Sequence, residues 1–335
     1  MSEDTHTAGD GRIADDGRTR VAIACQGGGS HTAFTAGVLQ RLLAEDDIEI
    51  VALSGTSGGA VCALLTWYGL TQGDRDLAAG LLDGFWHDIA ATAPWDAALN
   101  RALVTAAKLE GALLLPAVSP YYVPVSGLDH LRQLLAERVP AAAFATPTAE
   151  PLLIVSAVDV LSGAFTIFSS AADDPEERAG IDAVLASAAI PNLFRAVRIG
   201  ERLFWDGLFS QNPPLRKLFD AQPEALWVVR INPATTRREP RLWADILDRR
   251  NELTGNLSLN QELTVVDKIN KLARDGRLEG TGYRYVPWDV IALEGEPGLG
   301  LASKVDRRPA FLAHLMARGR QEAEHFLARR AAAPT

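Results

Sequence analysis

The chain has 335 residues and a formal net charge of −9, and 47% of its residues are hydrophobic while 22% are charged. This balance is typical of a globular protein with a large buried core and excludes wholesale disorder. The acidic excess argues against a nucleic-acid-binding protein, which usually carries a basic surface.

Residues 1–19 are rich in Gly, Asp, Thr and Arg, and this composition predicts a disordered tail. They contain no apolar core of a signal peptide, and no apolar run in the sequence is as long as a membrane span. We therefore expect a cytoplasmic protein without a transmembrane segment. The acidity disfavours broad adhesion to an anionic membrane but leaves local peripheral contact open.

Order is expected to begin at Arg20, and the first seventy residues alternate strand, glycine turn and helix. Residues 21–25 and 48–53 are apolar runs typical of buried strands, and a glycine cluster follows each. Apolar residues at helical spacing then predict helices over 33–44 and from 60 to 67. This alternation points to parallel strands joined by crossover helices.

The rest of the chain adds further strands and helices. We expect strands over 152–158, 164–168, 202–205 and 225–231, and helices over much of 74–145, over 180–188 and beyond Pro240. No internal repeat and no clear linker is evident. One α/β domain over 20–335 is therefore expected, with a core of about 20–232 and a helical C-terminal part of about 240–330.

The stretch Gly55-Thr56-Ser57-Gly58-Gly59 matches the pattern G-x-S-x-G between an apolar run and an apolar helix. In this pattern the serine lies on a sharp strand-to-helix turn with its hydroxyl exposed, so its neighbours must be small. The context favours Ser57 as a nucleophile, with Gly55, Gly58 and Gly59 as glycines of the turn. A serine that only caps the helix is the alternative.

Three consecutive glycines, Gly27, Gly28 and Gly29, follow the first predicted strand. The dinucleotide fingerprint needs a glycine where Thr32 stands, and the phosphate loop needs a lysine that is absent. A loop whose backbone N–H groups hold a negative oxygen is favoured instead, because the loops after neighbouring parallel strands meet in one crevice. A turn that merely requires positive φ is the alternative.

A serine nucleophile needs a base, and no histidine makes an obvious partner. Asp206 is the better candidate, because it follows a predicted strand at the glycine turn Asp206-Gly207. An aspartate that only stabilises the turn is the alternative. The other histidines after the glycine-rich loop fall among helical residues: His87, His130, His314 and His325.

Together these segments resemble the patatin-like phospholipase family. The glycines 27–29, the turn 55–59 and Asp206-Gly207-Leu208 occur in that family's order and contexts. Residues 186–194 (ASAAIPNLF) are similar to its A-S-x-A-x-P-x-x-F segment, and 211–214 (QNPP) to the N-x-P that follows its acid.

The resemblance covers about residues 20–232 and is specific as a set. It implies a three-layer α/β/α patatin-like fold with a mainly parallel central sheet, to which this chain adds C-terminal helices. It also implies a hydrolase acting on phospholipids or related lipid esters, without metal or organic cofactor. The expected partner is a lipid or acyl-ester substrate, and no nucleic acid is expected.

The resemblance further implies a catalytic dyad of Ser57 and Asp206, without a histidine. Ser57 would attack an ester carbonyl, and Asp206 would accept its proton and later activate water. Gly207 would complete the turn after the acid. The oxyanion hole would be formed by backbone N–H groups of the glycine-rich loop, with Gly58 able to add one: Gly27, Gly28, Gly29 and Ser30.

The glycine-rich loop departs from the family's pattern at two positions. The family places a basic residue and then a glycine after GGG-x, where this chain has His31 and Thr32. Histidine makes a side-chain anchor dependent on pH, and threonine restricts the backbone. We expect His31 to pack locally with the loop N–H groups still directed inward, and altered activity is the alternative.

Other functions could use the same residues. An acyltransferase, a thioesterase or a polyester depolymerase would share the dyad, a catalytically silent protein would only bind lipid, and a nucleotide-binding protein is least favoured. The residues leave open the head group, the cleaved position, the chain length, the oligomeric state and any activator.

Overall fold

The computed structural model describes residues 17–109, 119–122, 127–191, 193–236, 239–296 and 298–332, so the predicted tail lies almost wholly outside them. The strands are β1 (Thr19–Cys25), β2 (Ile48–Gly55), β3 (Leu152–Asp159), β4 (Phe165–Ser169), β5 (Val197–Ile199), β6 (Arg202–Asp206), β7 (Ala225–Arg230) and β8 (Trp288–Ala292). The helices are α1 (Ala33–Leu43), α2 (Gly58–Thr71), α3 (Arg75–Asp88), α4 (Pro94–Leu109), α5 (Gly127–Ala136), α6 (Ile181–Ser187), α7 (Trp243–Arg274) and α8 (Pro309–Ala332). Three short 3-10 helices matter below: η1 (Gly29–Thr32), η5 (Arg216–Ala221) and η6 (Leu301–Val305).

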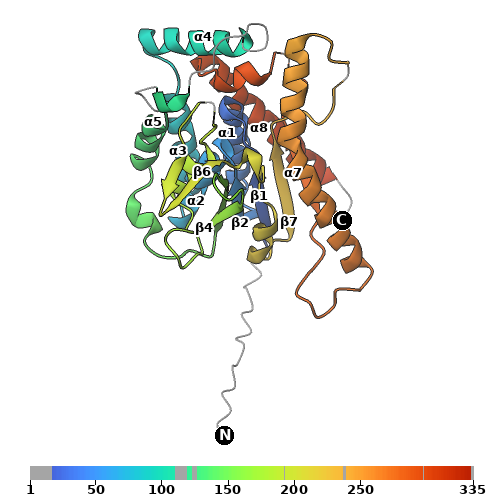
Figure 1. The fold of residues 1–335 in the computed structure, drawn as a ribbon. Coiled ribbons are helices and arrows are strands. Elements are labelled where there is room, and N and C mark those ends of the chain that lie inside the picture. The colour runs from blue at the N-terminus through green and yellow to red at the C-terminus, as the bar shows by residue number, and fades with distance from the viewer. Residues whose placement is uncertain are drawn as a thin grey trace.

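These strands form one mixed, mostly parallel sheet in the order β5-β6-β3-β2-β1-β7-β8, with β4 paired to β3. The pairs β1–β2, β1–β7, β2–β3 and β7–β8 are parallel. The pairs that involve β4, β5 and β6 are antiparallel. Figure 1 shows the sheet enclosed by helices, with β1 near its centre.

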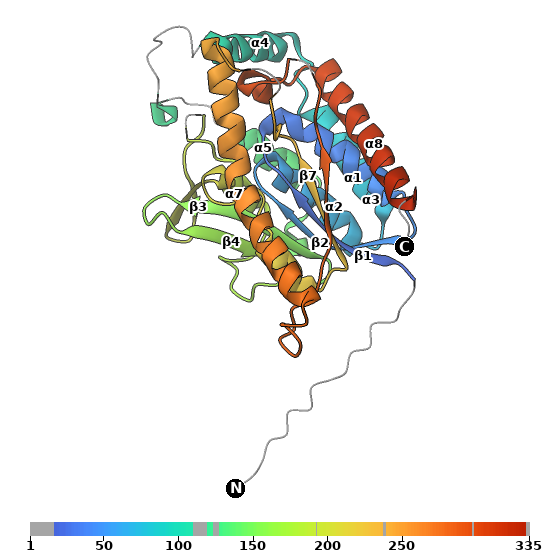
Figure 2. The same cartoon turned by 90° about the vertical axis from the view of Figure 1, so that its right-hand side faces the viewer.

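Different helices cover the two faces of the sheet. In β1, Val21, Ile23 and Cys25 belong to the core formed with α1, α2, α3 and α8. Ala22 and Ala24 point the other way, because side chains alternate along a strand, and pack with residues of η5 and α7. Figure 2 shows α1, α3 and α8 on one side of the sheet and α7 on the other. The predicted three-layer α/β/α fold is confirmed.

The C-terminal region contains the helices predicted beyond Pro240, as α7 and α8, but it is not purely helical. Residues 288–292 form β8, which extends the sheet beyond β7, and β5 adds another unpredicted strand at the opposite edge. β5 has only three residues with a charged Arg198 at its centre, and the apolar run of β8 is only four residues long (290–293) and follows Asp289, so both runs are at or below the length that predicts a strand.

Parallel strands direct their C-terminal ends to the same edge of a sheet. Cys25 at the end of β1 is paired with Gly55 at the end of β2, so the glycine-rich loop and the serine turn leave the sheet side by side. Figures 1 and 2 place this edge on the upper side of the molecule, toward α4 and the beginning of α7.

Candidate active site

Ser57 lies on the tight turn between β2 and α2 in a backbone conformation that few residues adopt. Its φ and ψ are 55° and −128°, and among the described non-glycine residues only Gln222 also has a positive φ. Such strain is characteristic of a serine turn that lifts its side chain above the sheet. The Ser57 N–H donates to Ser187 Oγ of α6 at 2.9 Å, which fixes the turn.

Glycines allow the serine turn and the glycine-rich loop to approach each other closely. A Cβ atom on Gly27 would overlap the carbonyl oxygen of Thr56 and lie 3.0 Å from the Cβ atom of Ser57. A Cβ atom on Gly58 would overlap the side-chain hydroxyl of Thr32. A side chain at either glycine would therefore push the loop away from the serine.

The register of the sheet brings Asp206 to the same place. Gly55, the last residue of β2, is paired with Val155 of β3, whereas Asp206, the last residue of β6, is paired with Ala157. Asp206 thus lies only two residues along β3 from the end of β2, next to the turn that carries Ser57.

The carboxyl group of Asp206 is buried, with 1% of the residue exposed. Its Oδ1 accepts a hydrogen bond from the Leu208 N–H at 2.8 Å. Burial raises the pKa of Asp206 from 3.8 to about 7, and the Leu208 N–H, a hydrogen bond with the Ser57 side chain and the charge of Lys304 limit the rise. A carboxyl with a pKa near 7 can accept a proton at neutral pH and release it again.

Three N–H groups of the glycine-rich loop, those of Gly28, Gly29 and Ser30, have no acceptor among the described residues. Gly29 has a φ of 58° and opens η1, which leads directly into α1. The N–H of Gly27 already donates to Asn212 Oδ1 at 2.7 Å. This bond speaks against the predicted donation by Gly27 to an oxyanion and leaves Gly28, Gly29 and Ser30 as the available donors of the loop.

A network of side-chain amides anchors the glycine-rich loop to α7. Gln26 Oε1 accepts from the Asn232 N–H at 3.0 Å, and Gln26 Nε2 donates to Asn256 Oδ1 at 2.9 Å. Asn212 Nδ2 donates to the carbonyl oxygen of Gly255 at 3.2 Å. The polar run 251–260 on α7 therefore supports the loop, a role that sequence analysis did not identify.

His31 packs locally, as predicted. It is 3% exposed, and its Nε2 atom is hydrogen-bonded with Ser303 Oγ of η6 at 2.8 Å. Burial, followed by the charge of Lys304, lowers the pKa of His31 to about 3. The ring is therefore neutral at physiological pH.

Lys304 on η6 is the neighbour of the site that sequence analysis missed. Its Nζ donates to Asn232 Oδ1 at 2.7 Å. A single lysine in the run Leu-Ala-Ser-Lys-Val carries no motif, so only the folded chain reveals its proximity to the glycine-rich loop.

The remaining predicted residues surround the same centre. Gly55 and Gly59 are in close contact within the serine turn, and Ser30 is buried in η1. Gly207 follows Asp206, and a Cβ atom there would collide with the backbone and side chain of Ser156. All predicted site residues therefore gather where β1, β2 and β6 end.

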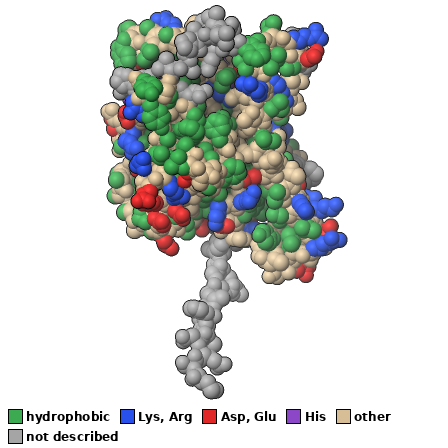
Figure 3. Space-filling model, viewed as in Figure 1, with side chains coloured by type: hydrophobic (Ala, Val, Ile, Leu, Met, Phe, Trp, Pro, Cys, Tyr) green, Lys and Arg blue, Asp and Glu red, His purple; other side chains and the backbone are tan. Residues whose placement is uncertain are grey.

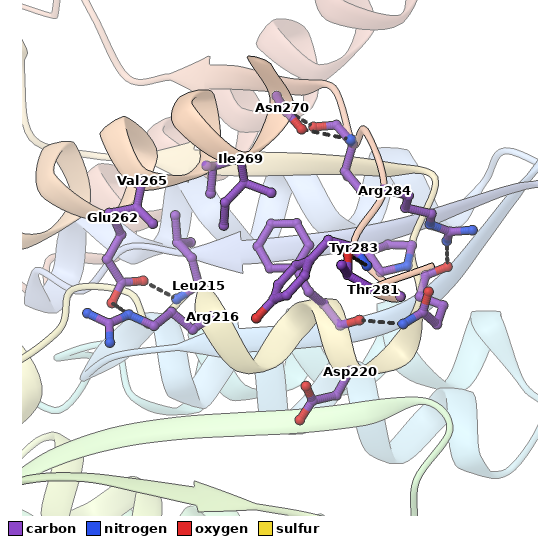
Figure 4. A pocket seen from close by; sticks show the side chains of 16 residues that line it. Leu215, Arg216, Asp220, Glu262, Val265, Ile269, Asn270, Thr281, Tyr283 and Arg284 are labelled. Carbon is purple, nitrogen blue, oxygen red and sulfur yellow. Dashed lines mark hydrogen bonds and ion pairs between the residues drawn. The ribbon is translucent and has the colours of Figure 1, made fainter. Parts of the chain in front are cut away.

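A cavity of about 730 Å³ lies elsewhere, between η5, the second half of α7 and residues 281–286 (Figure 4). Its wall includes Tyr283, Ile269 and Glu262, whose carboxylate accepts from the Leu215 N–H at 2.6 Å. Neither Ser57 nor the glycine-rich loop lines it. The described residues include no cluster of side chains suited to bind a metal ion.

The chain was compared with protein-family models and with solved structures. A family model described as patatin-like phospholipase matches residues 23–219. The chain also matches the crystal structure of VipD from Legionella pneumophila, with a TM-score of 0.38 and 14% identity, over 90% of this chain and 67% of that one. A second match is the type III effector protein ExoU, with a TM-score of 0.37 and 16% identity, over 92% of this chain but 53% of that one.

The chain thus spans about half the length of the ExoU chain that it matches. None of the curated proteins matches it. Across the described ranges, no helix combines the length and apolar character needed to cross a bilayer.

Proposed function

The chain belongs to the patatin-like phospholipase family, and on this basis we propose that it hydrolyses acyl esters of lipids, with Ser57 as the nucleophile and Asp206 as the base. One observation carries the proposal. A buried carboxyl with a pKa of about 7 lies beside a serine that is held in a strained turn. In this proposal Asp206 takes the place of a histidine base. His31, the histidine of the glycine-rich loop, is hydrogen-bonded to Ser303 instead.

In the first half of the reaction, Ser57 Oγ attacks the carbonyl carbon of the ester while Asp206 takes the hydroxyl proton. The N–H groups of Gly28 and Gly29 stabilise the negative carbonyl oxygen, aided by the N–H of Gly58 at the start of α2. The tetrahedral intermediate then collapses. Its C–O bond to the alcohol breaks, Asp206 returns the proton to the leaving alcohol, and an acyl-serine remains.

In the second half, water replaces the alcohol. Asp206 removes a proton from the water as its oxygen attacks the acyl carbon, and the same N–H groups hold the second oxyanion. Collapse of this intermediate breaks the bond to Ser57 Oγ, which regains its proton from Asp206. The products are a carboxylic acid and free enzyme, so the dyad is restored after each turnover.

Exposed apolar side chains near the site suit a lipid surface. On α4, Trp95, Leu99 and Leu103 recur at helical spacing and are 72%, 49% and 44% exposed. At the beginning of α7, Leu242 and Trp243 are 70% and 58% exposed. α4 and the beginning of α7 lie at the upper edge of the molecule in Figure 1, toward which the strands β1 and β2 run.

Figure 3 shows that hydrophobic side chains occupy much of the upper and central part of this face, whereas acidic ones gather lower down. We therefore propose peripheral contact between this upper edge and lipid aggregates, which would place ester groups near Ser57. Replacing Trp95 and Leu99 by serine should weaken co-sedimentation with phosphatidylcholine vesicles but leave hydrolysis of a water-soluble ester unchanged.

The proposed activity is tested with phosphatidylcholine micelles and a short p-nitrophenyl ester. The wild-type protein should release fatty acid and nitrophenol, and Ser57→Ala should release neither. Ser162→Ala, an exposed serine in the β3–β4 turn, is the matched control and should behave as wild type. Lipid binding without turnover in the wild type would instead support a silent lipid-binding protein, and transfer of the acyl group to an added alcohol would support an acyltransferase.

A further inference from the structure

The positive charge that acts on the pKa of Asp206 comes from η6, a segment that lies beyond the residues matched by the family model. Lys304 is the cation whose charge lowers the pKa of both Asp206 and His31. The glycine-rich loop has no cation of its own, because His31 is buried and neutral. Any positively charged group at this end of the site must therefore come from elsewhere in the fold.

The side chain of Lys304 runs along the glycines that carry the free N–H groups. The Cε atom of Lys304 lies 3.6 Å from the position that a Cβ atom on Gly28 would occupy. A Cβ atom on Gly29 would overlap the backbone carbonyl oxygen of Lys304. The hydrogen bond between His31 and Ser303 docks the loop onto the preceding residue of η6. The glycine-rich loop and η6 are thus in contact at Gly28 and Gly29 and, through His31, at Ser303.

The ammonium group of Lys304 is oriented but not neutralised. It donates one hydrogen bond, to Asn232 Oδ1 at 2.7 Å, and an ammonium group has three donors. No carboxylate of the described residues lies within ion-pair distance of Nζ, although Glu252, Asp248 and Asp206 attract it from further away. The residue as a whole is half-buried, and burial is the main cause that lowers the pKa of its ammonium group.

We propose that Lys304 is the positively charged group of the active site and that it binds the negative oxygen of the substrate beside the N–H groups of Gly28 and Gly29. This inference rests on the proposed acyl-ester hydrolysis. The negative oxygen is the one that forms on the attacked carbonyl group. A phosphate of the lipid head group has the same chemistry, so neutral and phosphorylated substrates must be compared.

Two further consequences concern pH. Burial lowers the pKa of Lys304 from 10.5 to about 8, against the attraction of Glu252, Asp248 and Asp206. The lysine is therefore charged at pH 7 and loses its charge as the pH rises through about 8. Its charge also keeps the pKa of Asp206 lower than burial alone would set it.

The test compares Lys304→Met, Lys304→Arg and the control Lys268→Met, an exposed lysine of α7, on p-nitrophenyl acetate, which is neutral, and on phosphatidylcholine. Lys304→Met should lower kcat on both substrates roughly 100- to 1,000-fold, as loss of an oxyanion donor does, with little change in KM. We expect wild-type activity to decline above about pH 8, where Lys304 loses its charge, and we expect Lys304→Met to lack this decline and to become active only at higher pH than wild type, because the pKa of Asp206 is then higher. Lys304→Arg should recover part of kcat, and Lys268→Met should match wild type.

Either of two results would overturn the inference: full activity of Lys304→Met on the neutral ester, or a loss of kcat without any change in the pH profile. A loss confined to phosphatidylcholine would assign the lysine to the phosphate of the head group instead. Circular dichroism checks that the variant is folded, and Lys304→Gln replaces Met if it is not. Turnover by Ser57→Ala would refute the proposed function itself, which is a different outcome from any of these.

Discussion

Replacing Asp206 by asparagine should abolish esterase activity and, at the same time, stabilise the folded protein as the pH rises. The carboxyl group is 1% exposed, and burial raises its pKa from 3.8 to about 7. Asparagine has nearly the same shape and can still accept the hydrogen bond from the Leu208 N–H. The variant therefore removes the buried charge and leaves the packing in place.

The sign and the size of the change in unfolding free energy follow from the pKa values of Asp206, which are 3.8 in the unfolded chain and about 7 in the folded protein. Above pH 7 the carboxylate is ionised in both states, and the buried charge costs the folded state about 4 kcal/mol. At pH 5 the folded protein holds the neutral acid while the unfolded chain is mostly ionised, and the cost falls to about 2 kcal/mol. We therefore compare the free energy of unfolding of Asp206→Asn with that of wild type at each pH. The advantage of the variant should be larger at pH 8 than at pH 5, by about 2 to 3 kcal/mol.

Urea unfolding followed by circular dichroism at pH 5, 6, 7 and 8 measures this difference. Asp46→Asn, an exposed aspartate before β2, is the control for the change in net charge and should show no such dependence on pH. Equal pH dependence in wild type and Asp206→Asn would mean that the carboxyl is not held near neutrality by burial. The proposed role of Asp206 as the base would then lose its physical basis.

Three other substitutions test the frame around the dyad. Gly27→Ala should reduce kcat/KM strongly and lower the melting temperature, because its Cβ atom would overlap the carbonyl oxygen of Thr56. The control Gly80→Ala in α3 places its Cβ atom in open space and should be neutral or stabilising by about 1 kcal/mol. Asn212→Leu should cost about 1 to 3 kcal/mol in urea unfolding and reduce kcat, because it leaves the Gly27 N–H without its acceptor. His31→Gln should leave the acidic limb of the pH–rate profile in place, since His31 has a pKa of about 3 and does not titrate near neutrality; a displaced limb would contradict this assignment.

The positions of the serine turn and the glycine-rich loop could be predicted from the sequence, because both depend on neighbouring residues of the chain. The serine turn and the glycine-rich loop are encoded by small residues directly after apolar strands, so Ser57 and its glycines could be located without a structure. Asp206 could be located because a glycine turn follows an apolar strand, although nothing in the sequence shows that β6 runs antiparallel to β3. The three-layer fold follows from the strand and helix alternation together with the family resemblance.

Residues that act through tertiary contacts could not be predicted in this way. Lys304 and Asn256 reach the glycine-rich loop only because η6 and α7 fold back over it. The same holds for Gly27, whose N–H is used by Asn212, a partner distant in sequence. The edge strand β8 was not predicted, because its apolar run is only four residues long (290–293) and Asp289 interrupts the strand.

The central claim is that Ser57 is an activated nucleophile, and covalent labelling with a fluorophosphonate tests it most directly. The account predicts that the wild-type protein forms one adduct, located on Ser57 by peptide mass spectrometry, and that Ser57→Ala forms none. Asp206→Asn should label far more slowly than wild type, because the base is missing. Absence of an adduct in folded wild-type protein, or an adduct on another serine, would contradict the claim.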